Sequence, residues 1–131
     1  MEIKVSVEQI SGSTSKGQAR QHTVLCDRPQ SKGGEDGGAM GGELFLMGLG
    51  GCFMSNLLAA SKARESPVSN FGVAITAQLE GTPPRFTEVE MAVSADYPDR
   101  QELEKLSLIA ERGCIVANTI KDVVALTIIL V

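Results

Sequence analysis

Cys52 and Cys114 are the residues of this chain best suited to chemistry. Cys52 ends the run Glu43-Leu-Phe-Leu-Met-Gly-Leu-Gly-Gly-Cys, and Cys114 ends the run Leu108-Ile-Ala-Glu-Arg-Gly-Cys. Cys114 lies near a predicted helix start, where free backbone N–H groups stabilise a thiolate, and Arg112 is close in sequence. A thiolate attacks a peroxide to give a sulfenic acid, which a second thiol converts to a disulfide. The pair therefore predicts thiol redox chemistry.

The other candidate residues favour different roles. Cys26 follows a predicted strand, a position typical of inert packing. His22 is the only histidine, and three scattered cysteines without C-x-x-C spacing predict no metal site. The loop 33–42 contains six glycines, but Glu35 and Asp36 make it a poor phosphate cradle. The role of this loop stays open. It is either a mobile segment or a segment held in backbone conformations that only glycine adopts readily.

Composition narrows the class of protein. A chain of 131 residues predicts one domain, 1–131, with a substantial core. The net charge of −4 and the absence of Trp argue against a nucleic-acid partner. The uncharged run 44–61 is interrupted by three glycines, Ser55 and Asn56, which favours a buried helix over a membrane span. An odd number of cysteines and no signal-peptide pattern predict a cytoplasmic protein.

Hydrophobic periodicity predicts the elements that must position these residues. Strand patterns are found at residues 2–10, 20–26, 68–80, 86–95 and 123–131, the last one predicted to be buried on both faces. Helical patterns are found at residues 43–63, 98–112 and 114–120. Residues 2–26 and 68–95 each predict a hairpin. The order ββ–α–ββ–αα–β predicts an α+β fold.

The predicted central helix, 43–63, is apolar nearly all round, as in helices buried on most faces. Three glycines of this helix, Gly48, Gly50 and Gly51, each lower its stability. We therefore expect them either to allow another backbone to approach closely or to leave the Cys52 thiol accessible. One small chain offers few elements to cover such a helix. We therefore expect a homodimer with twofold symmetry.

Four segments of the chain resemble the OsmC/Ohr family, in its OsmC-like branch. The resemblance runs from about Arg20 to Val131 and includes two separate cysteine motifs. The matching segments are the central helix Glu43-Leu-Phe-Leu-Met-Gly-Leu-Gly-Gly-Cys52, the turn Pro83-Pro-Arg-Phe-Thr, the second motif Ala110-Glu-Arg-Gly-Cys114-Ile-Val-Ala-Asn-Thr-Ile, and the preceding segment His22-Thr-Val-Leu-Cys-Asp-Arg-Pro with its glycine loop.

This resemblance implies an intertwined α+β homodimer with the central helices at its core. It also implies a cysteine peroxidase that reduces organic hydroperoxides without haem, metal or flavin. By the matching motifs, Cys52 would be the thiol that attacks the peroxide and Cys114 the resolving thiol. A dithiol such as a lipoyl protein, or another thiol reductant, would restore the pair.

The chain departs from the family pattern before the central helix. Peroxidases of the family carry a Pro-Glu pair there, whose Glu positions an arginine beside the thiolate. This chain has Gly41-Gly42 instead, and the nearest acid is Glu43. A shift of one residue along a helix turns a side chain by about 100° around the helix axis, so Glu43 need not point toward Cys52. Arg20 and Arg28 are both candidates for the activating arginine.

Three functions stay open on the sequence alone. The first is thiol-dependent reduction of organic hydroperoxides. The second is a non-catalytic dimer that binds a small apolar or thiol ligand, which the Gly41-Gly42 departure motivates. The third is a protein in which a Cys52–Cys114 disulfide is only structural, and a reducing compartment disfavours it.

Overall fold

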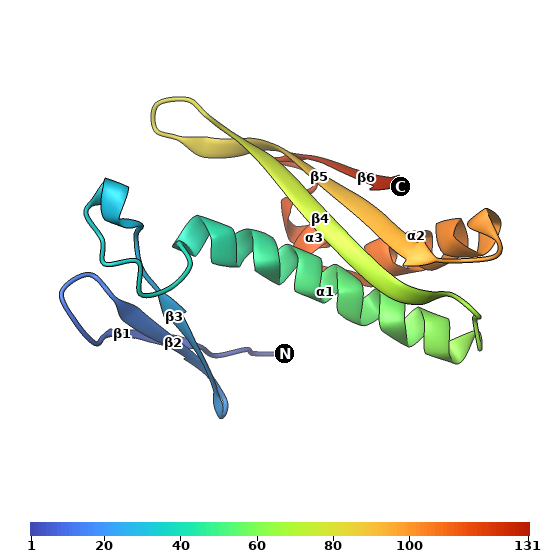
Figure 1. The fold of residues 1–131 in the computed structure, drawn as a ribbon, viewed down its shortest axis with the longest axis horizontal. Helices are drawn as coiled ribbons and strands as arrows, with labels where there is room; N and C mark the ends of the chain where they lie inside the picture. The colour runs from blue at the N-terminus through green and yellow to red at the C-terminus, as the bar shows by residue number, and fades with distance from the viewer. The chain divides into compact units, whose positions relative to one another are not determined.

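The computed structural model describes all 131 residues, which form two compact units, residues 1–46 and 47–131 (Figure 1). The boundary between the units falls inside helix α1, Gly41–Ala63. Each unit contains a three-stranded sheet, and the helices α1, α2 and α3 complete the fold. The predicted α+β class is therefore confirmed.

The N-terminal unit contains an antiparallel sheet of β1 (Ser6–Gln9), β2 (Ser15–Ala19) and β3 (His22–Cys26), in that order. The prediction of two strands here was wrong, because β2 lies in a stretch expected to be partly loop. The sequence of β2, Ser-Lys-Gly-Gln-Ala, has no apolar alternation. Strand β2 instead forms through backbone hydrogen bonds to both β1 and β3. It has no buried apolar face, so its sequence shows no strand pattern.

A short 3₁₀ helix, η1 (Gln30–Lys32), directly precedes the predicted glycine loop. The following residues fold back on β3, since Asp27 N–H donates to the Ala39 carbonyl at 3.1 Å. Ala39 also forms an isolated bridge with Cys26. The loop is therefore held against the end of the strand.

Helix α1 ends at Ala63, as predicted, and begins two residues earlier than expected. Six residues form its buried face: Leu49, Gly50, Phe53, Leu57, Ala60 and Ser61. The prediction of burial on most faces was wrong for the single chain, because Met47 is 57% exposed and Leu58 is 51% exposed. By length and composition α1 is also apolar enough to cross a membrane, and core helices of soluble proteins often are.

The C-terminal unit contains a sheet of β4 (Ser69–Glu80), β5 (Arg85–Asp96) and β6 (Ala125–Leu130), in that order. The β4–β5 hairpin is confirmed, and β6 joins β5 in parallel. The register places apolar residues in rows on one face: Val73, Val93 and Leu130; Ile75, Met91 and Ile128; Ala77, Val89 and Leu126.

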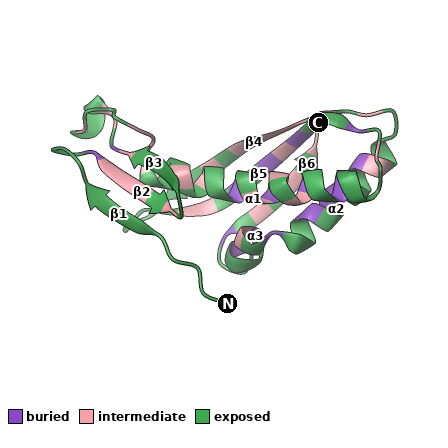
Figure 2. Cartoon of the chain, turned by 90° about the horizontal axis from the view of Figure 1, so that it is seen from below, coloured by how far each residue is buried: buried purple, intermediate pink, exposed green.

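Only this one face of the sheet is covered, as the burial colours in Figure 2 show for β5. Val89, Met91 and Val93 are buried, and the alternate residues Glu88 and Glu90 are exposed. The prediction that the last strand is buried on both faces was therefore wrong. In β6 every second residue is exposed, because the strand lies at a sheet edge with one uncovered face.

Helices α2 (Arg100–Gly113) and α3 (Ile115–Ile120) follow the hairpin, as predicted. The Asp99 carboxylate caps α2 by accepting the Gln101 N–H at 2.9 Å. Leu103, Leu106 and Ala110 form its buried face. Arg64, just after α1, pairs with Glu102 of α2 through two bonds of 3.0 and 3.1 Å. This ion pair ties the end of α1 to the start of α2.

Candidate functional site

Cys52 lies on α1, on the border between its buried and exposed faces. Leu49 and Phe53, one turn before it and one residue after it, are fully buried. The Cys52 side chain itself is only partly buried. Its position on a packed helix fixes the direction of the thiol while leaving it accessible.

Cys114 occupies the junction between α2 and α3 and is 0% exposed. It is the C-cap of α2 and the N-cap of α3, with extended backbone angles. The Ala117 N–H donates to its sulfur at 3.5 Å, and the sulfur lies 4.0 Å from the Leu49 carbonyl oxygen of α1. The junction therefore turns the Cys114 thiol toward the turn of α1 that carries Cys52.

The two thiols interact so that their pKa values shift in opposite directions. Partial burial acts to raise the pKa of Cys52, but donation from the Val116 N–H, the Cys114 thiol and the Ile115 N–H outweighs it and lowers this pKa. Burial raises the pKa of Cys114, and its bond to the Cys52 thiolate raises it further. Both cysteines are reduced in this structure. The arrangement favours a thiolate at Cys52 and a neutral thiol at Cys114.

Asn56 and Gly113 hold the two segments at close range. The Asn56 side-chain amide donates to the Cys52 carbonyl at 2.9 Å. Its Oδ1 lies so near Gly113 that an added Cβ would come within 2.8 Å of it. Gly113 therefore allows the α2–α3 junction to approach α1 where Cys52 lies.

A hollow of about 300 Å³ lies between α1 and β4 in the C-terminal unit, and Cys52 is not among the residues that line it. It is lined only by apolar residues: Met47, Gly50, Gly51, Met54, Val73 and Ile75. A Cβ at Gly50 would come within 2.6 Å of the Ile75 side chain, whereas one at Gly51 would meet no atom within 4 Å. Gly50 thus serves close packing of α1 on β4, and Gly51 leaves open space.

The remaining predicted site residues lie in the N-terminal unit. Glu43 accepts the Met40 N–H at 2.8 Å and so caps the start of α1. Arg20 lies in the β2–β3 turn with a φ of 56°, and Arg28 follows β3. Both arginines are exposed. An activating role for either arginine or for Glu43 stays a prediction.

Residues around the thiol pair that sequence reasoning missed are mostly backbone groups. The N–H groups of Ile115 and Val116 carry no sequence signal beyond a helix start after Cys114. Asn56 was noticed only as a polar interruption of the apolar run. Its spacing of four residues from Cys52 on one helix is the signal that points to the bond it makes. No group of three or more His, Cys, Asp or Glu side chains gathers where it would hold a metal ion.

Comparison with known proteins identifies relatives of the chain. Residues 33–129 match the model of the OsmC-like protein family. No curated protein matches the sequence. Among solved structures, a hypothetical protein from Aquifex aeolicus VF5 is similar, with a TM-score of 0.85 and 19% identity over 100% of this chain and 96% of that one.

Two further solved structures carry functional names. The organic hydroperoxide resistance protein OsmC of Legionella pneumophila has a TM-score of 0.76 and 19% identity, over 99% of this chain and 96% of that one. The organic hydroperoxide resistance protein OhrB of Bacillus subtilis has a TM-score of 0.72 and 16% identity, over 100% of this chain and 98% of that one. At these identities the likeness shows a shared fold.

Proposed function

We propose that this chain, which belongs to the OsmC-like protein family, reduces organic hydroperoxides with Cys52 and Cys114. The observation that carries the proposal is the packing of Cys114, at the α2–α3 junction, on the turn of α1 that carries Cys52. The pKa of Cys52 is lowered and that of Cys114 is raised, and the second thiol donates to the first. A peroxidase needs this arrangement, with one thiolate to attack and one thiol to resolve.

The reaction proceeds in two balanced steps. The Cys52 thiolate attacks the terminal oxygen of the hydroperoxide, the O–O bond breaks, and the alkoxide leaves and takes a proton to become an alcohol. Cys52 is then a sulfenic acid. Cys114 attacks its sulfur, a Cys52–Cys114 disulfide forms, and the sulfenic oxygen leaves as water. An external dithiol or thiol reductant supplies the two electrons that restore both thiols.

Apolar residues next to the two cysteines support organic hydroperoxides as the substrate class. Leu49 and Phe53 flank Cys52 on α1, and Ile115, which follows Cys114, is 61% exposed. Burial of each methylene group of a substrate contributes about 0.8 kcal/mol. We therefore expect alkyl and aryl hydroperoxides to react faster than hydrogen peroxide.

A homodimer is part of the proposal because α1 has an uncovered apolar stripe. Met47, Gly48, Gly51, Ser55 and Leu58 recur at helical spacing on this exposed side. A Cβ at Gly48 or Gly51 would meet no atom of the chain within 4 Å. Exposed apolar patches of this kind are typical of protein interfaces. A second copy of the chain is the occupant we propose.

Thiol counting by mass spectrometry after one equivalent of an organic hydroperoxide tests the reaction. Wild-type protein should lose two thiols rapidly, into a Cys52–Cys114 disulfide. Cys52→Ser should lose none rapidly, and Cys114→Ser should stop at a sulfenic acid that a dimedone probe traps. Cys26→Ser is the matched control and should behave as wild type. Rapid peroxide consumption by Cys52→Ser, or slow oxidation of all three thiols in wild type, would contradict the proposal.

Arg20→Gln and Arg28→Gln, compared in the same assay, would identify the activating cation. The arginine whose replacement slows the oxidation of Cys52 is the activating cation. Equal rates in both variants and in wild type would mean that the backbone N–H groups of Ile115 and Val116 suffice.

A further inference from the structure

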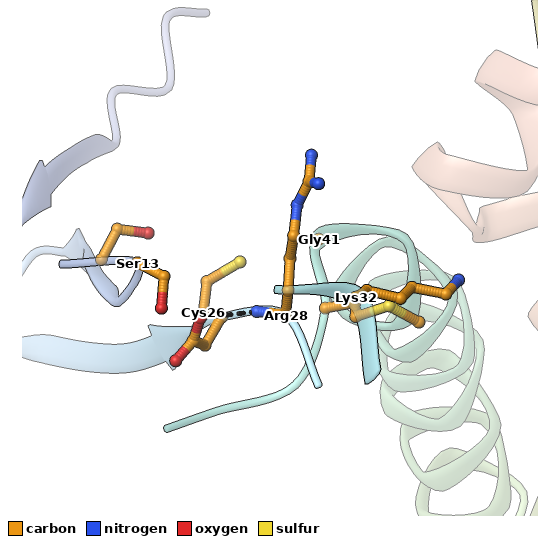
Figure 3. Close-up of a pocket in the computed structure, with 8 residues that line it drawn as sticks. Ser13, Cys26, Arg28, Lys32 and Gly41 are labelled. Carbon is orange, nitrogen blue, oxygen red and sulfur yellow. Dashed lines mark hydrogen bonds between the residues drawn. The ribbon is translucent and has the colours of Figure 1, made fainter. Parts of the chain in front are cut away.

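A cavity of about 480 Å³ lies in the N-terminal unit at the end of β3. Pockets for small molecules usually have volumes of roughly 300–1,000 Å³. Its polar walls are the Ser13 and Ser15 hydroxyls, the Cys26 thiol, the Asp27 carboxylate, and the Arg28 and Lys32 cations. Figure 3 shows the Cys26 sulfur between Ser13 and Arg28. All of these polar residues precede α1, and Gly41, the first residue of α1, also lines the cavity.

Backbone and hydroxyl donors hold the Asp27 carboxylate of this cavity in its ionised form, so its charge offsets one of the two nearby cations. It is 4% exposed and accepts the Gly37 N–H at 2.9 Å, the Thr14 hydroxyl at 2.7 Å and the Arg28 N–H at 2.6 Å. The Gly37 bond is the main reason why its pKa lies far below the ordinary value, although burial opposes the shift. The carboxylate therefore organises the loop and is not free to bind a cation.

The two cations of the cavity form no ion pair. The four ion pairs of the chain involve Lys4, Lys16, Arg64 and Arg100, and neither Arg28 nor Lys32. The nearby Glu43 carboxylate accepts the Met40 N–H and does not line the cavity. The Arg28 guanidinium and the Ser13 and Ser15 hydroxyls are therefore available to a ligand, whereas the Lys32 side chain extends away from Ser13 and Cys26 (Figure 3).

The glycine-rich loop makes this cavity a preformed one. A Cβ at Gly34 would overlap the Arg28 carbonyl oxygen, and one at Gly38 would overlap the Leu25 carbonyl oxygen. The Asp36 N–H donates to the Arg28 carbonyl at 3.0 Å, which fixes the backbone of Arg28. A site whose backbone is already ordered loses less entropy when a ligand binds.

We propose that this cavity binds the carboxylate or phosphate group of a small molecule. Arg28 would form two parallel hydrogen bonds to the oxyanion, a geometry that guanidinium groups favour. Lys32 adds a second positive charge, and the hydroxyls of Ser13 and Ser15 add neutral donors. This proposal does not depend on peroxidase activity.

Cys26 in the cavity wall provides a reporter for the test. Iodoacetate carries a carboxylate and iodoacetamide does not, but both alkylate thiols by the same displacement of iodide. Peptide mass spectrometry of wild-type protein gives the rate at which each reagent alkylates Cys26. The ratio of the iodoacetate rate to the iodoacetamide rate is then compared between the folded protein and the urea-unfolded chain. We expect the ratio in the folded protein to be about fivefold higher, the size of effect that two exposed cations exert on one anion.

Variants and competitors complete the experiment. Arg28→Gln combined with Lys32→Gln should return the ratio to the unfolded value, whereas Lys105→Gln combined with Lys121→Gln removes the same charge elsewhere and should not. Added succinate or inorganic phosphate should slow alkylation of Cys26 by iodoacetamide, and the stronger of the two identifies the oxyanion. A folded ratio equal to the unfolded one, or equal effects of the two double variants, would overturn the proposal.

Discussion

The two cysteines differ because their surroundings shift the thiol pKa in opposite directions. Cys52 receives hydrogen bonds from two backbone N–H groups and from Cys114, which favour its thiolate. Cys114 is fully buried and faces that negative charge, which favours its neutral form. No cationic side chain is needed for this difference. Backbone donors at the start of α3 thus supply part of what an activating arginine would supply.

The pH dependence of Cys52 alkylation tests this account. Its pKa is lowered, so its thiolate should form at lower pH than in the unfolded chain, and iodoacetamide should react with it faster at neutral pH. Cys114→Ala removes one donor and should shift the midpoint of the rate–pH profile upward. Cys26→Ala should leave the midpoint in place. An unchanged midpoint in Cys114→Ala would mean that the bond between the thiols has no effect.

Asp27 should make folding stability depend on pH. Its carboxylate has a folded pKa far below the ordinary 3.8, because Gly37, Thr14 and Arg28 donate to the ionised form. The stability it contributes is complete above pH 3.8 and is lost as the pH falls from there toward the folded pKa. Denaturant unfolding of Asp27→Asn should show a large loss at pH 7 and a smaller one at pH 3.

The matched control for this experiment is Asp122→Asn, which changes an exposed carboxylate. It should unfold as wild type does at both pH values. If Asp27→Asn lowers the free energy of unfolding by the same amount at both pH values, the charge of Asp27 does not contribute to stability.

At the scale of elements, the junction between α2 and α3 determines the site. Cys114 ends one helix and begins the next, so its extended backbone turns the sulfur toward α1. The same turn aims the N–H groups of Ile115 and Val116 at Cys52. Gly113 allows the approach because Asn56 occupies the space that a Cβ would need. The junction and one turn of α1 therefore act as a unit.

Gly113→Ala should slow disulfide formation. The new methyl group would come within 2.8 Å of Asn56 Oδ1, so Asn56 must move and its bond to the Cys52 carbonyl is lost. Loss of one such bond costs about 1 kcal/mol, and we expect disulfide formation after hydroperoxide treatment to slow about fivefold. Asn56→Ala removes the same bond and should slow the reaction by a similar factor, and the double variant Gly113→Ala/Asn56→Ala should be no slower than either single variant. Equal rates in Gly113→Ala and wild type would contradict this role.

At the scale of the whole molecule, the exposed stripe of α1 is the main feature that a single chain leaves unexplained. Its buried residues pack within the C-terminal unit, but Met47 and Leu58 are more than half exposed. A helix with apolar residues on two sides needs two partners. The rest of the chain covers one side, and the proposed second copy covers the other.

Leu58→Glu should prevent association. The charged side chain would lie on the exposed stripe, where burial against a second copy would leave it unpaired. Sedimentation velocity should show a dimer for wild type and a monomer for this variant. Val123→Glu changes another exposed apolar residue away from α1 and should remain dimeric. A monomeric wild type, or a dimeric Leu58→Glu, would place the interface elsewhere or exclude it.

The sequence by itself determined the elements whose patterns are periodic. Apolar spacing marked α1, the β4–β5 hairpin and α2, because each element has one buried face that recurs with its own period. It also marked Cys52 and Cys114 as a candidate redox pair. Strand β2 escaped prediction because backbone pairing forms it, and pairing partners distant in sequence leave no local pattern.

Only the tertiary structure decided how these groups act together. The contact of Cys114 with Cys52, and the opposite shifts of their pKa values, depend on packing between segments far apart in the chain. The same holds for Asp27, whose four donors are Thr14 and Arg28, before the glycine-rich loop, and Glu35 and Gly37, within it. Hydrogen bonds and burial act over a few ångströms in space, whatever the separation in sequence, so composition and spacing do not specify them.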